Sequence, residues 1–289
     1  MIPNMKDRLF ALSQHFMPQH ALSRLTRLVA ESQASTIKTP FINTFIKQYG
    51  IDMSEAANPD PASYASFNDF FTRALKPGAR TIAEGEKTVA CPADGAVSQL
   101  GDIQSGRIFQ AKGHDFGLKE LLGGDSSLED EFQQGKFSTI YLSPKDYHRV
   151  HMPFTGTLRS MTYIPGKLFS VNPATVNNVD NLFARNERVS CIFDTEFGPM
   201  AVVMVGAMIV ASIETVWAGL VTPPRGKLTT WTYPSEGEKA IHLNKGDELG
   251  RFKLGSTVIL CFPKDSIEWE ASLKEGSTTR MGQLIADYS

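Results

Sequence analysis

From about Thr88 onward, the chain alternates short apolar segments with turn-forming residues, and this texture restricts the fold more than any other feature. Val, Ile and Phe fill the segments, and Gly, Pro and Asp separate them. Apolar runs of about four to eight residues between such turn signals predict β-strands. The clearest runs are 139–142, 158–164, 189–193, 201–205 and 257–262. Short strands at this frequency predict a mainly β domain, built as a barrel or a sandwich.

The N-terminal part has helical spacing instead. Its apolar residues recur three or four positions apart in three groups: Leu9, Leu12 and Phe16; Leu22, Leu25, Leu28 and Val29; Phe41, Ile42, Phe45 and Ile46. Pro18 separates the first two groups, so they predict two amphipathic helices joined by a break, and the third group predicts another helix. We therefore expect an α+β chain that is mainly β, with a helical region at 1–86 and a β-rich domain at 87–289.

Two shorter helices are also predicted. Ser66 is a candidate N-cap, with Asp69 three residues later, for a helix that Pro77-Gly78 stops. Residues 118–122 predict a short helix within the β-rich part.

The charge is unevenly distributed along the chain. Residues 1–48 carry six basic and two acidic residues, a net charge of +4, and the whole chain carries −2, so the remainder is −6. Basic residues beside apolar stripes are typical of helices lying on an anionic membrane. The alternative is that these helices pack on the β-rich body. Without an overall basic excess, nothing points to nucleic acid.

The longest uncharged run favours buried strands over a membrane span. It covers Phe197–Ile213, 17 residues that include Gly198, Pro199 and Gly206, whereas a spanning helix needs about 20 residues. The three cysteines at 91, 191 and 261 fit no disulfide framework or metal motif, so we expect buried thiols in a reducing compartment.

Two histidines three positions apart lie in the segment 143–153, Ser-Pro-Lys-Asp-Tyr-His-Arg-Val-His-Met-Pro. Ser143 is a plausible N-cap and Pro144 suits a first helical position, and a helical turn would put His148 and His151 on one face. An extended strand would send them to opposite faces. The pair could bind a metal, act as general base or phosphate contact, or be structural. No cysteine or acidic residue has convincing spacing for a metal.

Asp94 and Ser256 are the other candidates. Asp94 lies in the turn 92–95, where Asp usually caps the turn, although beside a histidine it could orient the ring. Ser256 follows Gly255 and precedes the apolar run 258–260. A core strand would hold Ser256 rigidly, and Gly255 leaves its carbonyl carbon open to attack. The alternative is an ordinary Gly-Ser turn that enters a strand.

A second Gly-Ser-Thr tripeptide at 276–278 has charged neighbours, which predict an exposed loop.

Several common motifs are missing from the sequence. The chain contains no G-x-S-x-G elbow, P-loop or G-x-G-x-x-G motif. This argues against the common hydrolase, nucleotide-binding and dinucleotide-binding classes.

Taken together, these segments resemble the phosphatidylserine decarboxylase family in its bacterial, membrane-associated form. The resemblance is carried by Leu-Gly-Ser-Thr (254–257), Pro-Ala-Asp-Gly (92–95), Asp-Tyr-His-Arg-Val-His (146–151) and Phe-Ala-Arg-Asn-Glu-Arg (183–188), with support from 111–114, 193–198 and 213–219. Each motif is moderately specific, and their joint occurrence in order is highly specific. The resemblance covers about 50–262, and more loosely the N-terminal helices, with no departure at the chemically critical positions.

The resemblance implies a proenzyme that makes its own pyruvoyl cofactor. The bond Gly255–Ser256 would be cut by the protein itself, giving a β chain of residues 1–255 and an α chain of residues 256–289. Attack of the Ser256 hydroxyl on the Gly255 carbonyl gives an ester, and elimination then releases the Gly255 carboxylate. The dehydroalanine that remains loses ammonia by hydrolysis and becomes the pyruvoyl ketone.

The resemblance also implies a role for each candidate. His151 would be the base for Ser256, with Asp94 holding its ring. The pyruvoyl group from Ser256 would form a Schiff base with phosphatidylserine and accept the electron pair as carbon dioxide leaves, giving phosphatidylethanolamine. His148 would contact the substrate phosphate or carboxylate, or deliver a proton. No metal is implied.

A lipid substrate also gives the basic N-terminal region a function. Each Lys or Arg near an anionic leaflet contributes about 1 kcal/mol, which suits a peripheral protein on the cytoplasmic face of the cell membrane. The two chains would form a heterodimer, and further dimerisation is compatible with it. Two other hypotheses stay open: a serine hydrolase or autoprotease that uses Ser256, His151 and Asp94 without a cofactor, and a non-enzymatic membrane-docked β module, suggested by the turn 246–250.

Overall fold

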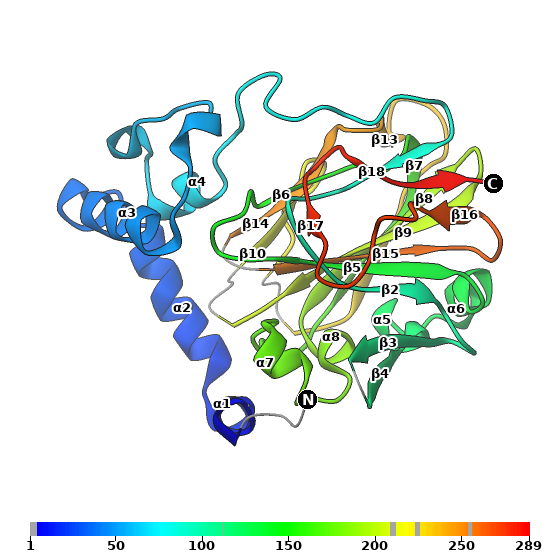
Figure 1. The fold of residues 1–289 in the computed structure, drawn as a ribbon, viewed down its shortest axis with the longest axis horizontal. Coiled ribbons are helices and arrows are strands. Elements are labelled where there is room, and N and C mark those ends of the chain that lie inside the picture. The colour runs from blue at the N-terminus through cyan, green and yellow to red at the C-terminus, as the bar shows by residue number, and fades with distance from the viewer. Residues whose placement is uncertain (1–4, 112, 209–211, 223–225, 254–255) are drawn as a thin grey trace.

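The computed structural model describes residues 5–289 except 112, 209–211, 223–225 and 254–255. A helical N-terminal region lies beside a larger β-rich body (Figure 1). Its elements are α1 (Met5–Phe16), α2 (Gln19–Ala30), α3 (Ser35–Tyr49), η1 (Met53–Glu55), η2 (Pro61–Ser63) and α4 (Phe67–Phe71). The three predicted amphipathic helices and the break at Pro18 are confirmed. None of the described helices is long and apolar enough to cross a membrane.

Two buried glutamines hold the junction of α1 and α2 on the body. The Gln14 amide donates to the Thr175 hydroxyl at 3.0 Å and accepts from the Ser170 N–H at 2.8 Å. The Gln19 side chain accepts from the Leu168 N–H at 2.8 Å. The contact is therefore polar and local to the junction, and it leaves the apolar stripe of α2 at the surface.

Aromatic rings connect α3 to α4. Phe41 and Phe67 stack with ring centroids 4.3 Å apart, and Phe45 contacts Phe67 edge-on at 4.9 Å. The predicted cap of α4 is confirmed, because the Ser66 hydroxyl accepts from the Asp69 N–H at 3.2 Å. This helix is short and gains its stability from packing, since its aromatic side chains are buried.

The body contains eighteen described strands and four short helices. The strands are β1 (Thr88–Ala90), β2 (Gly95–Asp102), β3 (Arg107–Ala111), β4 (His114–Gly117), β5 (Lys136–Leu142), β6 (Arg149–His151), β7 (Gly156–Ile164), β8 (Arg188–Thr195), β9 (Gly198–Gly206), β10 (Ser212–Thr215), β11 (Gly219–Leu220), β12 (Thr229–Thr232), β13 (His242–Leu243), β14 (Glu248–Lys253), β15 (Ser256–Phe262), β16 (Ile267–Trp269), β17 (Thr278–Thr279) and β18 (Leu284–Tyr288). The helices are α5 (Leu118–Leu121), α6 (Ser126–Phe132), α7 (Pro173–Val176) and α8 (Leu182–Arg185). All five clearest predicted strands and the short helix near 118 are confirmed.

The strands form open antiparallel sheets. The largest has nine strands in the order β12-β7-β8-β9-β15-β5-β2-β17, with β13 also paired to β7. A four-stranded sheet has the order β11-β10-β14-β6, and smaller sheets are β1-β18-β16 and β3-β4. The barrel alternative is wrong, because no pairing among the described strands joins β12 or β13 at one edge of the large sheet to β17 at the other. The chain is α+β and mainly β, as predicted.

Strand β15 lies at the centre of the large sheet, between β5 and β9. All seven of its residues are buried, which explains why its sequence is a continuous apolar, β-branched run rather than an alternating one. The uncharged run 197–213 also forms strands where it is described, in β9 and the start of β10. One hydrophobic core joins the large sheet to the four-stranded sheet, with Val258, Leu260, Val150 and Phe252 among its members.

Candidate active site

Ser256 is the first residue of the central strand. It pairs with Leu142 of β5 and with Gly206 of β9, and its side chain is wholly buried. The Ser256 hydroxyl has no hydrogen-bond partner among the described residues. Among the described residues this hydroxyl is one of several buried hydroxyls of the sheet without a partner, with Ser138, Ser190 and Thr257. Gly255, on the other side of the expected cleavage bond, lies outside the described residues.

His148 is a second wholly buried polar side chain. Its Nδ1 lies 2.8 Å from the Asp146 carbonyl oxygen, which can only accept, so Nδ1 carries the proton. Its Nε2 therefore has a free lone pair and no partner among the described residues. The Phe71 ring covers the imidazole at a centroid distance of 4.0 Å. Burial lowers the pKa of His148 to about 3, so the ring is neutral at pH 7.

The segment between β5 and β6 is a turn followed by an extended strand, not a helix. The Asp146 carboxylate accepts from both the N–H and the hydroxyl of Ser143, each at 2.7 Å, and this closes the turn. The chain then pairs with β14. His148 and His151 therefore fall on opposite faces of the extended segment, as the strand alternative requires.

His151 is also neutral but has two partners. Its Nδ1 donates to the Gly246 carbonyl oxygen at 2.8 Å, so its Nε2 accepts from the Tyr147 hydroxyl at 3.0 Å. Burial lowers the pKa of His151, and the negative charges of Glu248 and Asp94 partly oppose this shift. Nε2 is therefore the atom of this imidazole that can take up a proton. In this structure it accepts the hydrogen bond of the Tyr147 hydroxyl.

The two histidines lie beside different parts of β14, whose C-terminal end leads along the chain to Ser256. His151 pairs with Glu248, whereas the His148 carbonyl accepts from the Phe252 N–H at 3.0 Å. A bulge in β14 between Glu248 and Gly250 takes up one residue, so the two histidines are three extended residues, or about 10 Å, apart along their own segment. Because Ser256 follows Phe252 along the chain, His148 lies at the end of β14 that leads to the serine.

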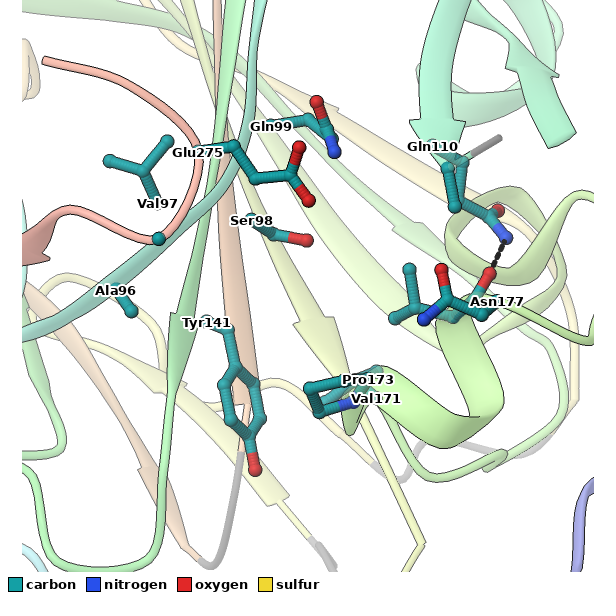
Figure 2. Close-up of a pocket in the computed structure, with 13 residues that line it drawn as sticks. Ala96, Val97, Ser98, Gln99, Gln110, Tyr141, Val171, Pro173, Asn177 and Glu275 are labelled. Carbon is teal, nitrogen blue, oxygen red and sulfur yellow. Dashed lines mark hydrogen bonds between the residues drawn. The ribbon is translucent and has the colours of Figure 1, made fainter. Parts of the chain in front are cut away.

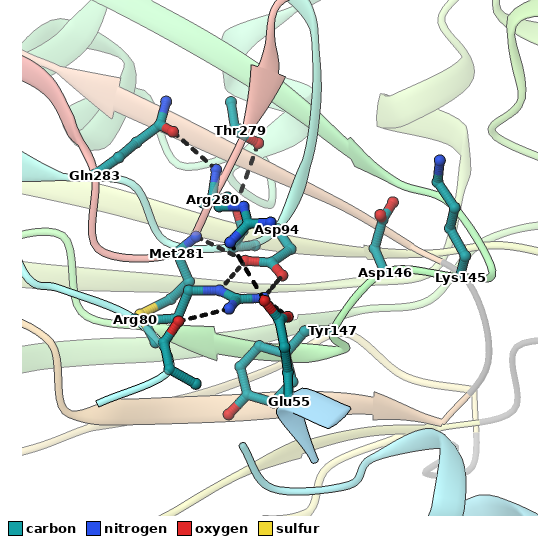
Figure 3. Close-up of polar contacts among 12 residues, drawn as sticks. Glu55, Arg80, Asp94, Lys145, Asp146, Tyr147, Thr279, Arg280, Met281 and Gln283 are labelled. Atoms are coloured by element: carbon teal, nitrogen blue, oxygen red, sulfur yellow. Dashed lines mark hydrogen bonds and ion pairs between the residues drawn. The ribbon is translucent and has the colours of Figure 1, made fainter. Parts of the chain in front are cut away.

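Asp94 belongs to a separate polar network (Figure 3). Its carboxylate accepts from two nitrogens of Arg80 and, at 2.8 Å, from the Met281 N–H. Arg80 also pairs with Glu55 at 2.8 Å. Gly95 allows this turn to lie close to β5, since a Cβ there would meet the Tyr141 carbonyl oxygen at 2.3 Å.

The Asp94 turn and His151 meet through the backbone. The His151 N–H donates to the Pro92 carbonyl oxygen at 2.8 Å. No hydrogen bond between the Asp94 side chain and either histidine is recorded among the described residues. The structure thus groups His151 with the Asp94 turn and His148 with the approach to Ser256.

An apolar cavity of about 200 Å³ lies on the side of β2 and β5 that faces α7 (Figure 2). Tyr141 lines it and pairs with Thr257, next to the serine. Its Gln110 side chain donates to the carbonyl oxygens of Val176 and Val179, each at 2.8 Å. The candidate residues Asp94, His148, His151 and Ser256 do not line this cavity.

The sequence reasoning missed two contributors to this region. Tyr147 belongs to the segment 143–153, and its position directly before His148 is the only signal in the sequence that points to it. Arg80 lies 14 positions before its partner Asp94, and nothing local in the sequence connects them.

Comparison with known proteins gives a consistent family. The family model described as phosphatidylserine decarboxylase matches residues 67–287, and one described as PSD matches residues 9–50. A phosphatidylserine decarboxylase proenzyme of Pseudomonas putida (strain GB-1) is 62% identical over 283 residues, covering 98% of this chain and 99% of its own. Proteins of the same name in Pseudomonas entomophila (strain L48) and Pseudomonas fluorescens (strain Pf0-1) are 61% and 59% identical over 282 residues, with 98% of this chain covered and 98% and 99% of their own.

Proposed function

Since this chain belongs to the phosphatidylserine decarboxylase family, we propose that it is made as a proenzyme, cuts its Gly255–Ser256 bond and turns Ser256 into a covalent pyruvoyl group. The mature protein decarboxylates phosphatidylserine to phosphatidylethanolamine and carbon dioxide. The observation that carries the proposal is the match over nearly the whole chain to proenzymes of this family, with Ser256 wholly buried as the first residue of the central strand.

In the proposed maturation, the Ser256 oxygen attacks the Gly255 carbonyl carbon while a base takes the hydroxyl proton. We assign the base to His151, as the family resemblance implies, because its Nε2 is unprotonated and the charge of Asp94 acts on this ring and not on that of His148. Asp94 stabilises the imidazolium that forms, through its charge near the ring. For this step the Tyr147 hydroxyl must release Nε2, so the proposal includes a local movement of the segment before β6.

The pyruvoyl group, once present, supplies an electron sink for the bond to the departing carboxylate. A buried, apolar site suits this chemistry because it excludes water. His148 contributes the lone pair at Nε2. An anionic group close to it would raise the pKa of His148, since a negative charge favours the protonated ring. His148 would then hold a proton at Nε2 and return it to the substrate carbon after carbon dioxide leaves.

The sheet topology supports a stable complex of the two chains. Residues 256–289 contain β15, which is paired on both edges, and β18, which lies between β1 and β16. The contact of Asp94 with Met281 also joins the two chains. We therefore propose a β/α heterodimer, with a helical region at 1–86 and a sandwich-like catalytic domain at 87–289.

The exposed face of α2 supports peripheral attachment to an anionic membrane. Leu25 and Leu28 are 63% and 70% exposed, and Phe16 at the end of α1 is 83% exposed. An exposed apolar stripe on a basic segment is typical of interfacial helices. We propose that this surface rests on the cytoplasmic face of the cell membrane, where the lipid substrate lies.

The test is the intact mass of the purified chains under denaturing conditions. The proposal expects a 34-residue α chain, residues 256–289, whose mass shows an N-terminal pyruvoyl group and which lacks a free N-terminal amine. Borohydride should abolish decarboxylation. Ser256→Ala should stay uncut at about 31.8 kDa, whereas Ser277→Ala, in the second Gly-Ser-Thr, should mature normally.

Two results would contradict the proposal. An α chain with N-terminal serine would support a hydrolase or autoprotease without a cofactor. An uncut chain whose activity resists borohydride would contradict self-cleavage altogether.

A further inference from the structure

Two arginines among those whose side chains the structure describes are almost wholly buried, and they differ in how their donors are used. Arg188 is 2% exposed, and its guanidinium donates to the carbonyl oxygens of Leu121 at 2.9 Å, Asn186 at 2.7 Å and Glu120. Each of its nitrogens thus has a backbone acceptor. Arg188 shows what a structural buried arginine looks like in this fold.

Arg73 is 5% exposed but its donors are largely free. Its Nε and Nη1 have no hydrogen-bond partner among the described residues, and its Nη2 makes one long contact, 3.4 Å, with the Lys145 carbonyl oxygen. A buried charge without hydrogen bonds costs several kcal/mol. Burial accordingly lowers the pKa of Arg73. The Phe70 ring lies 5.3 Å from the Cζ of Arg73 and contacts the cation, but a ring provides no hydrogen-bond acceptor of the usual kind. The guanidinium is therefore suited to an anion that the protein does not itself provide.

The nearby carboxylates already have other partners. Asp94 accepts from Arg80 and Met281, and the Asp146 carboxylate accepts from Ser143. No ion pair of Arg73 is recorded among the described residues. The open donors therefore point to a ligand rather than to a side chain.

Arg73 lines a polar cavity of about 300 Å³ between the helical region and the body. Lys145 and Tyr147 also line it. The other charged residues of its wall are Asp52, Glu55, Asp94, Asp146, Arg80 and Arg280. All four of these carboxylates already accept hydrogen bonds within the protein. On its other side Arg73 is close enough to His148 for its charge to affect that ring, and the adjacent Phe71 packs on the same imidazole. Arg73 thus lies between this cavity and the buried imidazole of His148.

We propose that Arg73, with Lys145 at the cavity wall, binds the phosphodiester of the phosphatidylserine headgroup. The inference rests on the proposed function. A guanidinium fork matches two oxygens of a phosphate. The phosphodiester keeps its charge throughout the reaction, so binding it does not oppose the loss of carbon dioxide. Pairing the reacting carboxylate with Arg73 would stabilise the reactant more than the transition state and slow the reaction.

The test uses two headgroup analogues as inhibitors of the mature enzyme acting on phosphatidylserine in detergent micelles. Glycerophosphoethanolamine contains the phosphodiester but no carboxylate, and O-methylserine contains the carboxylate but no phosphate. Arg73→Gln should raise the inhibition constant of glycerophosphoethanolamine by about 10- to 100-fold, as expected for a charge-assisted contact. The constant for O-methylserine should change by less than about threefold.

Each other outcome overturns the inference. A larger effect on O-methylserine would mean that Arg73 holds the carboxylate, and equal effects on both analogues would mean a structural role. Arg159→Gln, which removes an arginine paired with Glu131 and Asp194 on the body, should leave both constants unchanged.

Maturation is measured in the same preparations, so failure of the proposed function remains distinguishable. A wild-type chain that never forms the pyruvoyl group would contradict the proposed function before any inhibitor is added. If Arg73→Gln accumulates as precursor, Arg73→Lys is used, because it keeps the buried charge but loses the fork. It should mature and weaken glycerophosphoethanolamine binding by about tenfold. Unchanged binding by a matured Arg73→Lys would overturn the inference.

Discussion

The Nε2 atom of His151 lies 3.0 Å from the hydroxyl oxygen of Tyr147. Because Nδ1 donates to Gly246, the tyrosine must be the donor in this contact. The proposed base is therefore a neutral imidazole with its proton on Nδ1. Its Nε2 lone pair accepts the hydrogen bond of the Tyr147 hydroxyl. Tyr147 thus controls the atom that is expected to deprotonate Ser256.

Tyr147→Phe should raise the pH at which self-cleavage begins to fail. The phenol donates to the neutral imidazole and so favours it over the protonated form. Its removal raises the pKa of His151 and moves the acidic limb of the cleavage profile to higher pH. Cleavage of newly made protein is followed on denaturing gels between pH 5 and 8. Complete loss of cleavage at every pH would instead place Tyr147 in the proton transfer itself.

Substitution of the two histidines should separate maturation from decarboxylation. His151→Ala should accumulate precursor, with cleavage slowed by about 100-fold or more, as expected for loss of a general base. His148→Ala should still be cut but should decarboxylate slowly, because its free Nε2 acts after maturation. Gel analysis and carbon dioxide release measure the two steps. A precursor that accumulates in His148→Ala and not in His151→Ala would reverse the assignment of the base.

Asp94→Asn should slow self-cleavage by about 100-fold or more, since it removes the negative charge that stabilises the protonated base. Glu55→Gln is the matched control. It removes the other carboxylate of Arg80 while Asp94 keeps its charge and its contact with Met281. This control should mature within about twofold of the wild-type rate. Equal slowing in both variants would show that the ion pair with Arg80 matters, not the charge near His151.

His148 should make the protein less stable as the pH falls. Its folded-state pKa is about 3, below the value of about 6.5 in an unfolded chain. Above about pH 6.5 neither state binds the proton, and between about pH 6.5 and about 3 only the unfolded state does. The free energy of unfolding should therefore fall by about 1.4 kcal/mol per pH unit in that window.

Urea unfolding of Ser256→Ala, with and without His148→Gln, measures this effect at pH 7, 6 and 5. The glutamine variant should show a slope that is smaller by about 1.4 kcal/mol per unit between pH 6 and 5. Other titrating groups are common to both proteins and cancel in the difference. Identical slopes would mean that His148 is protonated in the folded state.

The exposed stripe of α2 should determine membrane attachment. Leu25→Glu with Leu28→Glu should weaken binding to anionic vesicles at least about tenfold, since it removes apolar area and adds like charge. Leu228→Glu, at a leucine that is 50% exposed on the body, is the matched control. Vesicle sedimentation measures the effect. Undiminished binding, or a change in oligomeric state instead, would contradict a membrane-facing role for this helix.

Local signals in the sequence predicted local structure well. Continuous apolar runs identified β5 and β15, and Ser66 identified the start of α4, because these features depend on neighbours in the chain. The sequence left the histidine segment open between helix and strand, because pairing with the distant β14 decides it. The contact of Asp94 with Arg80 and the fact that the large sheet stays open depend on long-range geometry, which no local pattern records.

The central place of β15 has a consequence for the lifetime of the enzyme. In the proposed mature form the reactive keto group is borne on the first residue of a strand that is paired on both edges. Unlike a diffusible coenzyme, such a group cannot be exchanged without unfolding the sheet. A single protonation at the keto carbon instead of the substrate carbon, followed by hydrolysis, would leave the substrate's nitrogen on residue 256 as an alanine and release the lipid as an aldehyde. The molecule would then be inactivated permanently, and only new synthesis could restore the lost activity.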